Sequence, residues 1–277
     1  MIHVAETRAD FERCAEIYNA VEPDRVLTAE EAASGNGTSL LHEGGGFAFV
    51  GPSSVTGSAF GMVRVHPGAR GRGIGSSLLD ALRAETRTIG RESVWGRVRD
   101  SASLAFVDKR GFTEVTREVN VLRELKPGDG EIAAGISELR DQHLRGVYEL
   151  CVETIPEIHV PLPGEAPPYD EWLEKEKHQA SVGFVALDDG SVVGYARLYE
   201  TGLPHRLEHG LTAVRRSHRR RGLATALKQA QIRWAADNGY SELVSDMVEG
   251  NAAMRAVNER LGYRPLPPVV VVSASVS

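Results

Sequence analysis

The stretch Val63–Ser76, VRVHPGARGRGIGS, decides the fold, because a second copy of it follows at Thr212–Thr225 as TAVRRSHRRRGLAT. In each copy a valine-containing strand pattern leads into basic residues, and a helical pattern then begins at a small residue. Arg70 and Arg219 lie 149 positions apart. A repeat of that length indicates two copies of one domain rather than a solenoid of short units.

The rest of each half follows the same order of predicted elements. A short strand and a helix come first, then strands that end at the quoted loop, then a helix, a strand, a second helix and a last strand. Antiparallel strands that lead into strand–helix–strand units indicate an α/β fold with a mixed, mostly antiparallel sheet and helices on both faces.

The boundary between the copies is predicted at the breaker cluster Lys126–Gly130. The predicted domains are therefore residues 1–126 and 131–277. The first helix of the second half is expected to stop before Pro156, because proline disrupts a helix. The last strands, near residues 115–125 and 269–272, are each expected to complete their own half.

Composition limits the classes of protein that the chain can represent. It has 277 residues, a formal net charge of −6 and 42% hydrophobic residues, which is typical of a globular protein with two domains. No apolar run approaches the ~18–20 residues that span a bilayer, and the N-terminus lacks a secretory signal pattern. The two cysteines, Cys14 and Cys151, are too few for a fold that disulfides stabilise, and we interpret both as buried thiols. We expect a cytoplasmic protein that binds neither membrane nor nucleic acid.

The quoted loop has the character of a pyrophosphate cradle. The first N–H groups of a helix lack internal partners and lie at the positive end of its dipole, and small residues allow a phosphate to approach them. Three alternatives stay open: a plain helix cap, a dinucleotide fingerprint that fails at Ser76, where a third glycine belongs, and a solvated or nucleic-acid-binding basic run over 215–221. The candidate cradle residues are Arg219, Arg220, Arg221, Gly222, Leu223, Ala224 and Thr225 and, in the first half, Arg70, Gly71, Arg72, Gly73, Ile74, Gly75 and Ser76.

Two such loops, each followed 41 or 43 residues after its arginine by a glycine–aromatic pair, resemble the GNAT acyltransferase superfamily. Its signature, Arg/Gln-x-x-Gly-x-Gly/Ala, matches both loops, and its downstream Asn matches Asn251. The glycine–aromatic pairs are Gly111-Phe112 and Gly262-Tyr263, but the first half has Asp100 at the Asn position. The resemblance covers about residues 59–112 and 206–263 and includes mycothiol synthase-like and antibiotic-modifying two-domain enzymes.

The resemblance implies that acetyl-CoA, or another acyl-CoA, inserts between the fourth and fifth strands of a domain. A bulge near Ala213-Val214 would aim a backbone N–H at the thioester oxygen, and Val65 is the first-half counterpart of Val214. Asn251 is implied as a further cofactor-binding residue. We expect the second half to be catalytic and the first half to be a degenerate copy.

The resemblance also implies a general base, because an alkyl ammonium must lose a proton before it attacks a thioester. Family members often place a Glu eleven residues before the signature Arg; that residue is Glu208 in the second half and Ala59 in the first. Asp246 and Glu249 are backup bases that would act through water. The alternative for Glu208 is a surface carboxylate. A metal site built from Glu208 and nearby histidines is not expected.

The family's usual thiolate acid, a Tyr, is replaced by Asn258 in the second half and Val107 in the first. Asn258 can donate a hydrogen bond to the leaving thiolate but no proton. The step that protonates sulfur therefore has no assigned acid.

The expected function is acyl-CoA-dependent N-acetylation of a small amine by a monomer or homodimer. The amine is expected to be cationic, because acidic residues crowd an insert in the second half: Glu157, Glu165, Asp170, Glu171, Glu174 and Glu176. Those carboxylates can equally form a solvated helix face. The alternative functions are a non-catalytic acyl-CoA-binding module and a protein N-terminal or lysine acetyltransferase.

Overall fold

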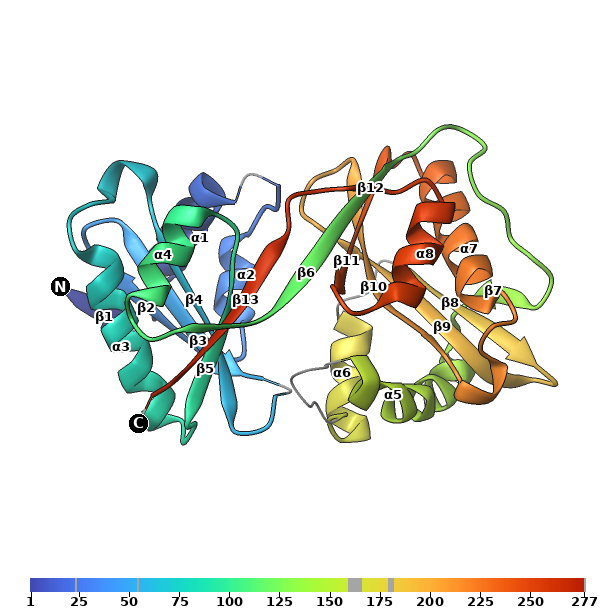
Figure 1. The fold of residues 1–277 in the computed structure, drawn as a ribbon, viewed down its shortest axis with the longest axis horizontal. Helices are drawn as coiled ribbons and strands as arrows, with labels where there is room; N and C mark the ends of the chain where they lie inside the picture. The colour runs from blue at the N-terminus through green and yellow to red at the C-terminus, as the bar shows by residue number, and fades with distance from the viewer. Residues whose placement is uncertain (23, 54, 159–165, 179–181, 277) are drawn as a thin grey trace. The chain divides into compact units, whose positions relative to one another are not determined.

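The computed structural model describes residues 1–22, 24–53, 55–158, 166–178 and 182–276. The chain divides into two compact units, Met1–Arg117 with Val269–Ser277 (unit 1) and Glu118–Pro268 (unit 2). Both are mixed α/β units, which confirms the predicted fold class (Figure 1). The limits 1–126 and 131–277 stay a prediction of where the sequence repeat divides.

Unit 1 contains a mixed sheet with the strand order β1-β2-β3-β4-β5-β13. Neighbouring strands are antiparallel except for β4 and β5, which are parallel and are joined through a helix, as parallel neighbours require. The strands are β1 (Ile2–Val4), β2 (Thr38–His42), β3 (Gly46–Pro52), β4 (Ser58–Val65), β5 (Ser93–Val98) and β13 (Val269–Ser275).

Helices cover both faces of this sheet. Alternate residues of β3 point to opposite faces, so Ala48 and Val50 pack with α3 while Phe47 packs with α1. Helix α1 begins at a capping box in which Thr7 and Asp10 satisfy each other's backbone N–H groups. The helices are α1 (Arg8–Val21), α2 (Ala29–Ser34), α3 (Ile74–Thr88) and α4 (Ser101–Asp108), and a short 3₁₀ turn, η1, spans Pro67–Ala69.

Unit 2 repeats this plan with the strand order β6-β11-β10-β9-β8-β7, and β12 pairs with β6. Only β10 and β11 are parallel among the described pairs. The strands are β6 (Thr113–Glu124), β7 (Ile136–Glu138), β8 (Val182–Asp188), β9 (Ser191–Glu200), β10 (Arg206–Val214), β11 (Glu242–Val248) and β12 (Arg264–Pro265). The helices are α5 (Leu144–Ile158), α6 (Tyr169–His178), α7 (Leu223–Asp237) and α8 (Ala252–Arg260), with 3₁₀ turns η2 (Asp141–His143) and η3 (Arg216–His218).

Helix α5 corrects one prediction, because it continues through Pro156 to Ile158 instead of stopping before it. Pro156 lies in the last turn, so its missing N–H costs a single helical hydrogen bond there. Helices α5 and α7 cover opposite faces of the unit 2 sheet, since Tyr195 of β9 packs with α5 while Ala196 packs with α7. Cys14 and Cys151 are buried and free on α1 and α5, and burial raises the pKa of each thiol, to about 11 and about 12.

The last strands are exchanged relative to the sequence repeat. Strand β13, from the C-terminal end of the chain, pairs with β5 of unit 1 over Val270–Ser275. Residues 118–124 of β6, which follow the first repeat, pair with β11 of unit 2. The expectation that each last strand completes its own half is therefore wrong. A strand's alternation of side chains shows that it pairs, but it does not identify the partner.

Candidate functional site

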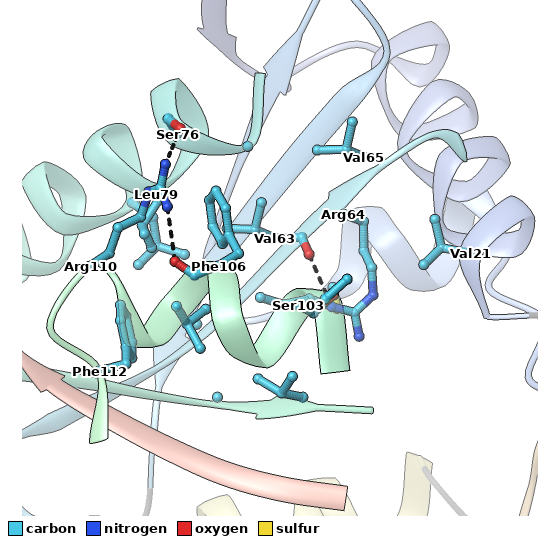
Figure 2. Close-up of a pocket in the computed structure, with 18 of the residues that line it drawn as sticks. Val21, Val63, Arg64, Val65, Ser76, Leu79, Ser103, Phe106, Arg110 and Phe112 are labelled. Atoms are coloured by element: carbon cyan, nitrogen blue, oxygen red, sulfur yellow. Dashed lines mark hydrogen bonds between the residues drawn. The ribbon is translucent and has the colours of Figure 1, made fainter. Parts of the chain in front are cut away.

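Strands β4 and β5 separate along their length and open a cavity in unit 1. They pair only where Ser58–Phe60 meets Ser93–Trp95, and both then continue without a partner on that side, to Val65 and Val98. The space between them is a cavity of about 490 Å³ that also contacts α3, α4 and the end of α1 (Figure 2). That volume lies in the range of small-molecule sites.

The quoted loop forms one end of this cavity. Gly71 and Gly73 take left-handed backbone conformations with φ of 78° and 79°, and a Cβ built at either would meet nothing within 4 Å. Helix α3 begins directly after Gly73, and no side chain caps it. Its first N–H groups are therefore available to an anion. Of the cofactor-binding residues predicted in the first half, all but Arg72 line the cavity: Val65, Arg70, Gly71, Gly73, Ile74, Gly75 and Ser76.

The interior of the cavity is mostly apolar. Figure 2 shows Leu79 of α3 and Phe106 of α4 at its wall, and Arg110 hydrogen-bonds Ser76 Oγ at 2.7 Å and the Phe106 carbonyl at 2.9 Å. The Arg110 guanidinium also lies 3.8 Å from the centroid of the Phe106 ring. These contacts tie the start of α3 to the end of α4, which keeps the loop end of the cavity in place.

Unit 2 carries the same loop in a strained form. Gly222 has φ of 82°, and α7 begins after it without a side-chain cap. The unit 2 counterpart of Gly71 is Arg220, and its backbone is also left-handed, with φ of 62°. A residue with a Cβ in this conformation costs about 1–2 kcal/mol.

Three arginines of the unit 2 loop are already paired. Glu157 on α5 binds Arg216 at 2.5 Å and Arg219 at 2.6 Å, and these partners hold the pKa of Glu157 below its usual value, Arg219 first. Arg215 pairs with Glu153, which also lies on α5, at 3.3 Å. Neither Arg70 nor Arg72, the loop cations of unit 1, has an ion pair among the described residues.

Strand β10 contains the predicted bulge. Its pairing with β9 shifts between His209 and Thr212, so β10 carries one extra residue there, a few positions before the predicted Ala213-Val214. The matching pair in unit 1, β3 with β4, has a continuous register. A bulge re-aims backbone groups at the edge of a cleft.

The extra residue changes which positions correspond before the bulge. Ala59 pairs with Val94 in unit 1, and Leu207 pairs with Leu243 in unit 2. The structural counterpart of Glu208 is therefore Phe60 rather than Ala59. Counting eleven residues back from each signature Arg missed this shift, because the extra residue lies within the counted stretch.

Six positions that line the unit 1 cavity hold buried polar side chains in unit 2, which we call the polar cluster. Following the strand pairing and the repeat offsets, Gly61, Leu79, Leu82, Gly96, Val107 and Phe112 correspond to His209, Lys228, Gln231, Ser245, Asn258 and Tyr263. Each member of the polar cluster is less than 9% exposed. Sequence reasoning missed the cluster, although the aligned pairs Leu79/Lys228 and Leu82/Gln231 already carried its signal.

Hydrogen bonds join several members of the polar cluster. His209 on β10 contacts Gln231 of α7 at 2.9 Å and Tyr263, beyond α8, at 2.5 Å. Lys228 contacts Ser245 at 3.4 Å and lies over the Tyr263 ring. Burial lowers the pKa of Lys228 to about 7 and that of His209 well below its ordinary value. The imidazole of His209 stands where unit 1 has Gly61, which has no side chain.

The predicted catalytic residues occupy several places in unit 2. Glu208 is half-buried and lies opposite Tyr199 of β9, on the face that α5 and α6 cover. Asp246 and Glu249 are exposed, at the end of β11 and just after it. Asn258 is 1% exposed, and its amide nitrogen lies 3.7 Å from the sulfur of Met247.

Asn251 has a structural task. Its side chain accepts a hydrogen bond from the Met254 N–H at 3.1 Å and caps α8. Asp100 caps α4 in the same way, through the Ser103 N–H at 2.8 Å. Capping is a sufficient reason for an Asn or Asp at these positions.

The acidic insert of unit 2 is partly internal. Glu176 of α6 is buried against Arg197 and Tyr195 of β9 and makes an ion pair with Arg197. Trp172 packs in the core beside α5. Asp170, Glu171 and Glu174 are exposed, and Glu165 lies outside the described residues. The insert therefore does not present one continuous acidic surface.

Two further observations concern the described part of the chain. No group of three or more His, Cys, Asp or Glu side chains there is arranged to hold a metal ion. No described helix is long and apolar enough to cross a membrane.

Comparison with known proteins relates both halves to one family. Two models match the chain, the GNAT acetyltransferase domain over residues 22–114 and the GNAT acetyltransferase family over residues 144–263, which together span more than half of it. No curated protein matches the chain in sequence.

Solved structures share the fold over the whole chain. A tandem GNAT protein from the clavulanic acid biosynthesis pathway is 20% identical, with a TM-score of 0.78 over 100% of this chain and 99% of its own. A GCN5-related N-acetyltransferase from Sphaerobacter thermophilus is 19% identical, with a TM-score of 0.75 over 99% of this chain and 96% of its own. A GCN5-related N-acetyltransferase from Kribbella flavida is 19% identical, with a TM-score of 0.55 over 94% and 93%.

Proposed function

Because the chain belongs to the GNAT family of N-acetyltransferases, with one such domain in each half, we propose that it transfers an acyl group from acyl-CoA, bound in the unit 1 cavity, to an amine. The observation that carries this proposal is the cavity between β4 and β5, which ends at an uncapped helix N-terminus with open glycine positions. Acetyl-CoA is the acyl donor that we expect.

The residues present fit such a donor. The backbone N–H groups at Gly73–Gly75, with Arg70 beside them, suit a pyrophosphate. The unpaired inner edges of β4 and β5 offer main-chain groups to an extended pantetheine arm, in the manner of an added strand. Leu79 and Phe106 would shield that arm from water.

The reaction is direct transfer between the two substrates. The amine nitrogen forms a bond to the acyl carbon, and the carbon–sulfur bond breaks with its electron pair left on sulfur. The proton that the amine loses ends on the thiolate or in solvent. A thiolate is a tolerable leaving group, since a thiol has a pKa of ~8.5. The chain's contribution is to hold the thioester in the dry part of the cavity and to position the amine.

We propose that one chain binds one acyl-CoA. The polar cluster occupies in unit 2 the six positions that line the cavity in unit 1, and His209 of β10 contacts Tyr263 within it. Glu157 also neutralises two arginines of the unit 2 loop. Both features oppose entry of a pantetheine arm and a pyrophosphate.

The second candidate keeps the working site in unit 2, as the sequence predicts. The bulge in β10 and the half-buried Glu208 beside it favour this assignment. In that case Glu208→Gln lowers turnover by ~10²–10⁴-fold with little change in the KM for acetyl-CoA.

The test is calorimetry with acetyl-CoA on two loop variants. Gly73→Asp places a negative charge at the helix N-terminus of unit 1, so we expect acetyl-CoA affinity to fall by at least about tenfold. Gly222→Asp should leave affinity within about twofold and the stoichiometry at one per chain. Gly73→Asn and Gly222→Asn are matched controls, because Asn tolerates the left-handed backbone and adds no charge.

The reverse pattern assigns the donor site to unit 2. If neither variant loses acetyl-CoA binding, both loop assignments are contradicted. Thiol release with a panel of amines then separates an enzyme from a non-catalytic acyl-CoA-binding module.

A further inference from the structure

One side of the unit 1 cavity lies on the face of the sheet that α1 covers. Glu22, at the end of α1, lines it together with Arg64 of β4 and Arg99, which follows β5. Because side chains alternate along a strand, Arg64 shares a face with Met62, and Met62 packs with α1. This side of the cavity, which we call the mouth, therefore lies on the opposite face of the sheet from α3.

Glu22 is held between two guanidinium groups at the mouth. Its carboxylate binds Arg64 at 2.7 Å and Arg99 at 3.3 Å. The side chains of Glu22 and Arg64 are 15% and 16% exposed, while that of Arg99 is 55% exposed. Arg64 also donates to the Val63 carbonyl at 3.1 Å, and its Nε has no partner among the described residues. The mouth thus retains a buried donor that its own chain does not satisfy.

At the mouth two guanidiniums, those of Arg64 and Arg99, face the single carboxylate of Glu22. Arg97 also lines the cavity and lies over the Trp95 ring, which shares the mouth's face. The other acidic residue in the cavity wall, Asp100, is occupied in capping α4. Arginine forks are suited to carboxylate and phosphate oxygens.

We propose that the acceptor is an amine that carries its own anionic group, a carboxylate or a phosphate, and that Arg64 and Arg99 select it. The inference rests on the proposed function, since it assigns the acceptor for the same unit 1 cavity. The anion lies against the guanidiniums, and the ammonium lies on the side of Glu22. A purely cationic amine would meet the surplus of positive charge at the mouth.

One other anion could occupy the same groups, namely the 3′-phosphate of CoA itself. The geometry favours the acceptor, because the mouth and the α3 loop lie on opposite faces of the sheet. A role in binding CoA predicts a change in acetyl-CoA affinity, whereas a role in binding the acceptor predicts a change in the KM for the amine alone.

The experiment measures thiol release from acetyl-CoA by the whole chain with matched pairs of amines. Each free amino acid is paired with its amide, an amino-sugar phosphate with its unphosphorylated sugar, and spermidine serves as a cationic probe. We expect kcat/KM to be at least about tenfold higher for the anionic member of a preferred pair, in line with a charge-assisted hydrogen bond. Equal rates for both members of every pair, or a preference for the amide or spermidine, overturn the proposal.

A variant locates the effect at the mouth. Arg99 is largely exposed, so Arg99→Gln should fold, raise the KM of the anionic amine by about tenfold and leave the KM of its amide unchanged. Arg8→Gln is the control, because Arg8 is an exposed arginine of α1 outside the cavity. A rise in the KM for acetyl-CoA instead assigns the mouth to the CoA phosphate and overturns the acceptor assignment. Failure of the proposed function is distinguishable, since it appears as acetyl-CoA affinity that Gly73→Asp does not change.

Discussion

Units 1 and 2 have the same strand order around the same loop, but the residues beside the two parallel strands differ in chemical character. In unit 1 Gly61, Leu79 and Leu82 border an open cavity. In unit 2 the corresponding positions hold the buried polar cluster, in which His209 contacts Gln231 at 2.9 Å. The difference teaches that a duplicated domain can keep its loop while the residues behind the loop change from apolar to polar.

The largest expected effect comes from deleting residues 269–277, which removes β13 from unit 1. Val269, Val271 and Val272 are each at most 3% exposed, and burial of each valine stabilises by roughly 1.5–3 kcal/mol. The loss is comparable with the net stability of a whole domain, ~5–15 kcal/mol. We expect unit 1 to unfold and unit 2 to persist. Limited proteolysis with mass spectrometry checks this, and Ser275→Ala is the control.

A truncated chain in which unit 1 resists protease as well as the full chain does would contradict the exchange of last strands. Protection of neither unit would show that the two do not fold separately. Either result changes the comparison between the units.

The next effect concerns the buried charge that distinguishes unit 2. The pKa of Lys228 is about 7 when folded, against an ordinary 10.5. The unfolded chain therefore binds more protons between those values, and the free energy of unfolding of unit 2 should rise with pH from about 7 to about 10.5. Lys228→Met should abolish this rise and stabilise unit 2 at pH 7 by about 1–3 kcal/mol.

Urea unfolding at pH 7, 8 and 9 is the measurement for Lys228→Met. Leu79→Met is the matched change in unit 1, and it should leave the pH dependence as it is. If Lys228→Met destabilises unit 2 at every pH, the polar cluster is a net source of stability and the ammonium is well accommodated.

The smallest effect tests the two loops. Arg220→Gly should relieve the left-handed strain and stabilise unit 2 by about 0.5–1 kcal/mol. The reciprocal change Gly71→Arg should destabilise unit 1 by about 1 kcal/mol, since a Cβ there meets no atom and only the backbone conformation is affected. Thermal unfolding checks both, and Arg220→Ala separates the loss of charge from the gain in backbone freedom.

The sequence predicted the parts of the fold that depend on local chemistry. The two loops, the helices that follow them and the buried thiols Cys14 and Cys151 were all predicted, because glycine positions and apolar periodicity are local signals. The exchange of β6 and β13 was not predictable, because strand pairing joins residues far apart in sequence.

The candidate site was predictable in part. Counting along the repeat located the loop at Gly73. It could not reveal the extra residue in β10, because of which Glu208 corresponds to Phe60 of unit 1. Nor could it show that Glu22 and Arg64 meet at the mouth, since they belong to different elements. The roles assigned to Glu208, Asn258 and the loop residues stay predictions.

The place of β13 has a consequence for how the protein is made. A ribosome synthesises the chain from the N-terminus onward, and most domains can fold as soon as their own segment has left the ribosome. Unit 1 cannot, because the strand that covers the edge of β5 comes after unit 2 in the sequence. Residues 1–117 must wait, with that edge unpaired, while the whole of unit 2 is synthesised. Any nascent chain that terminates early therefore carries an exposed strand edge, which is the feature that promotes aggregation.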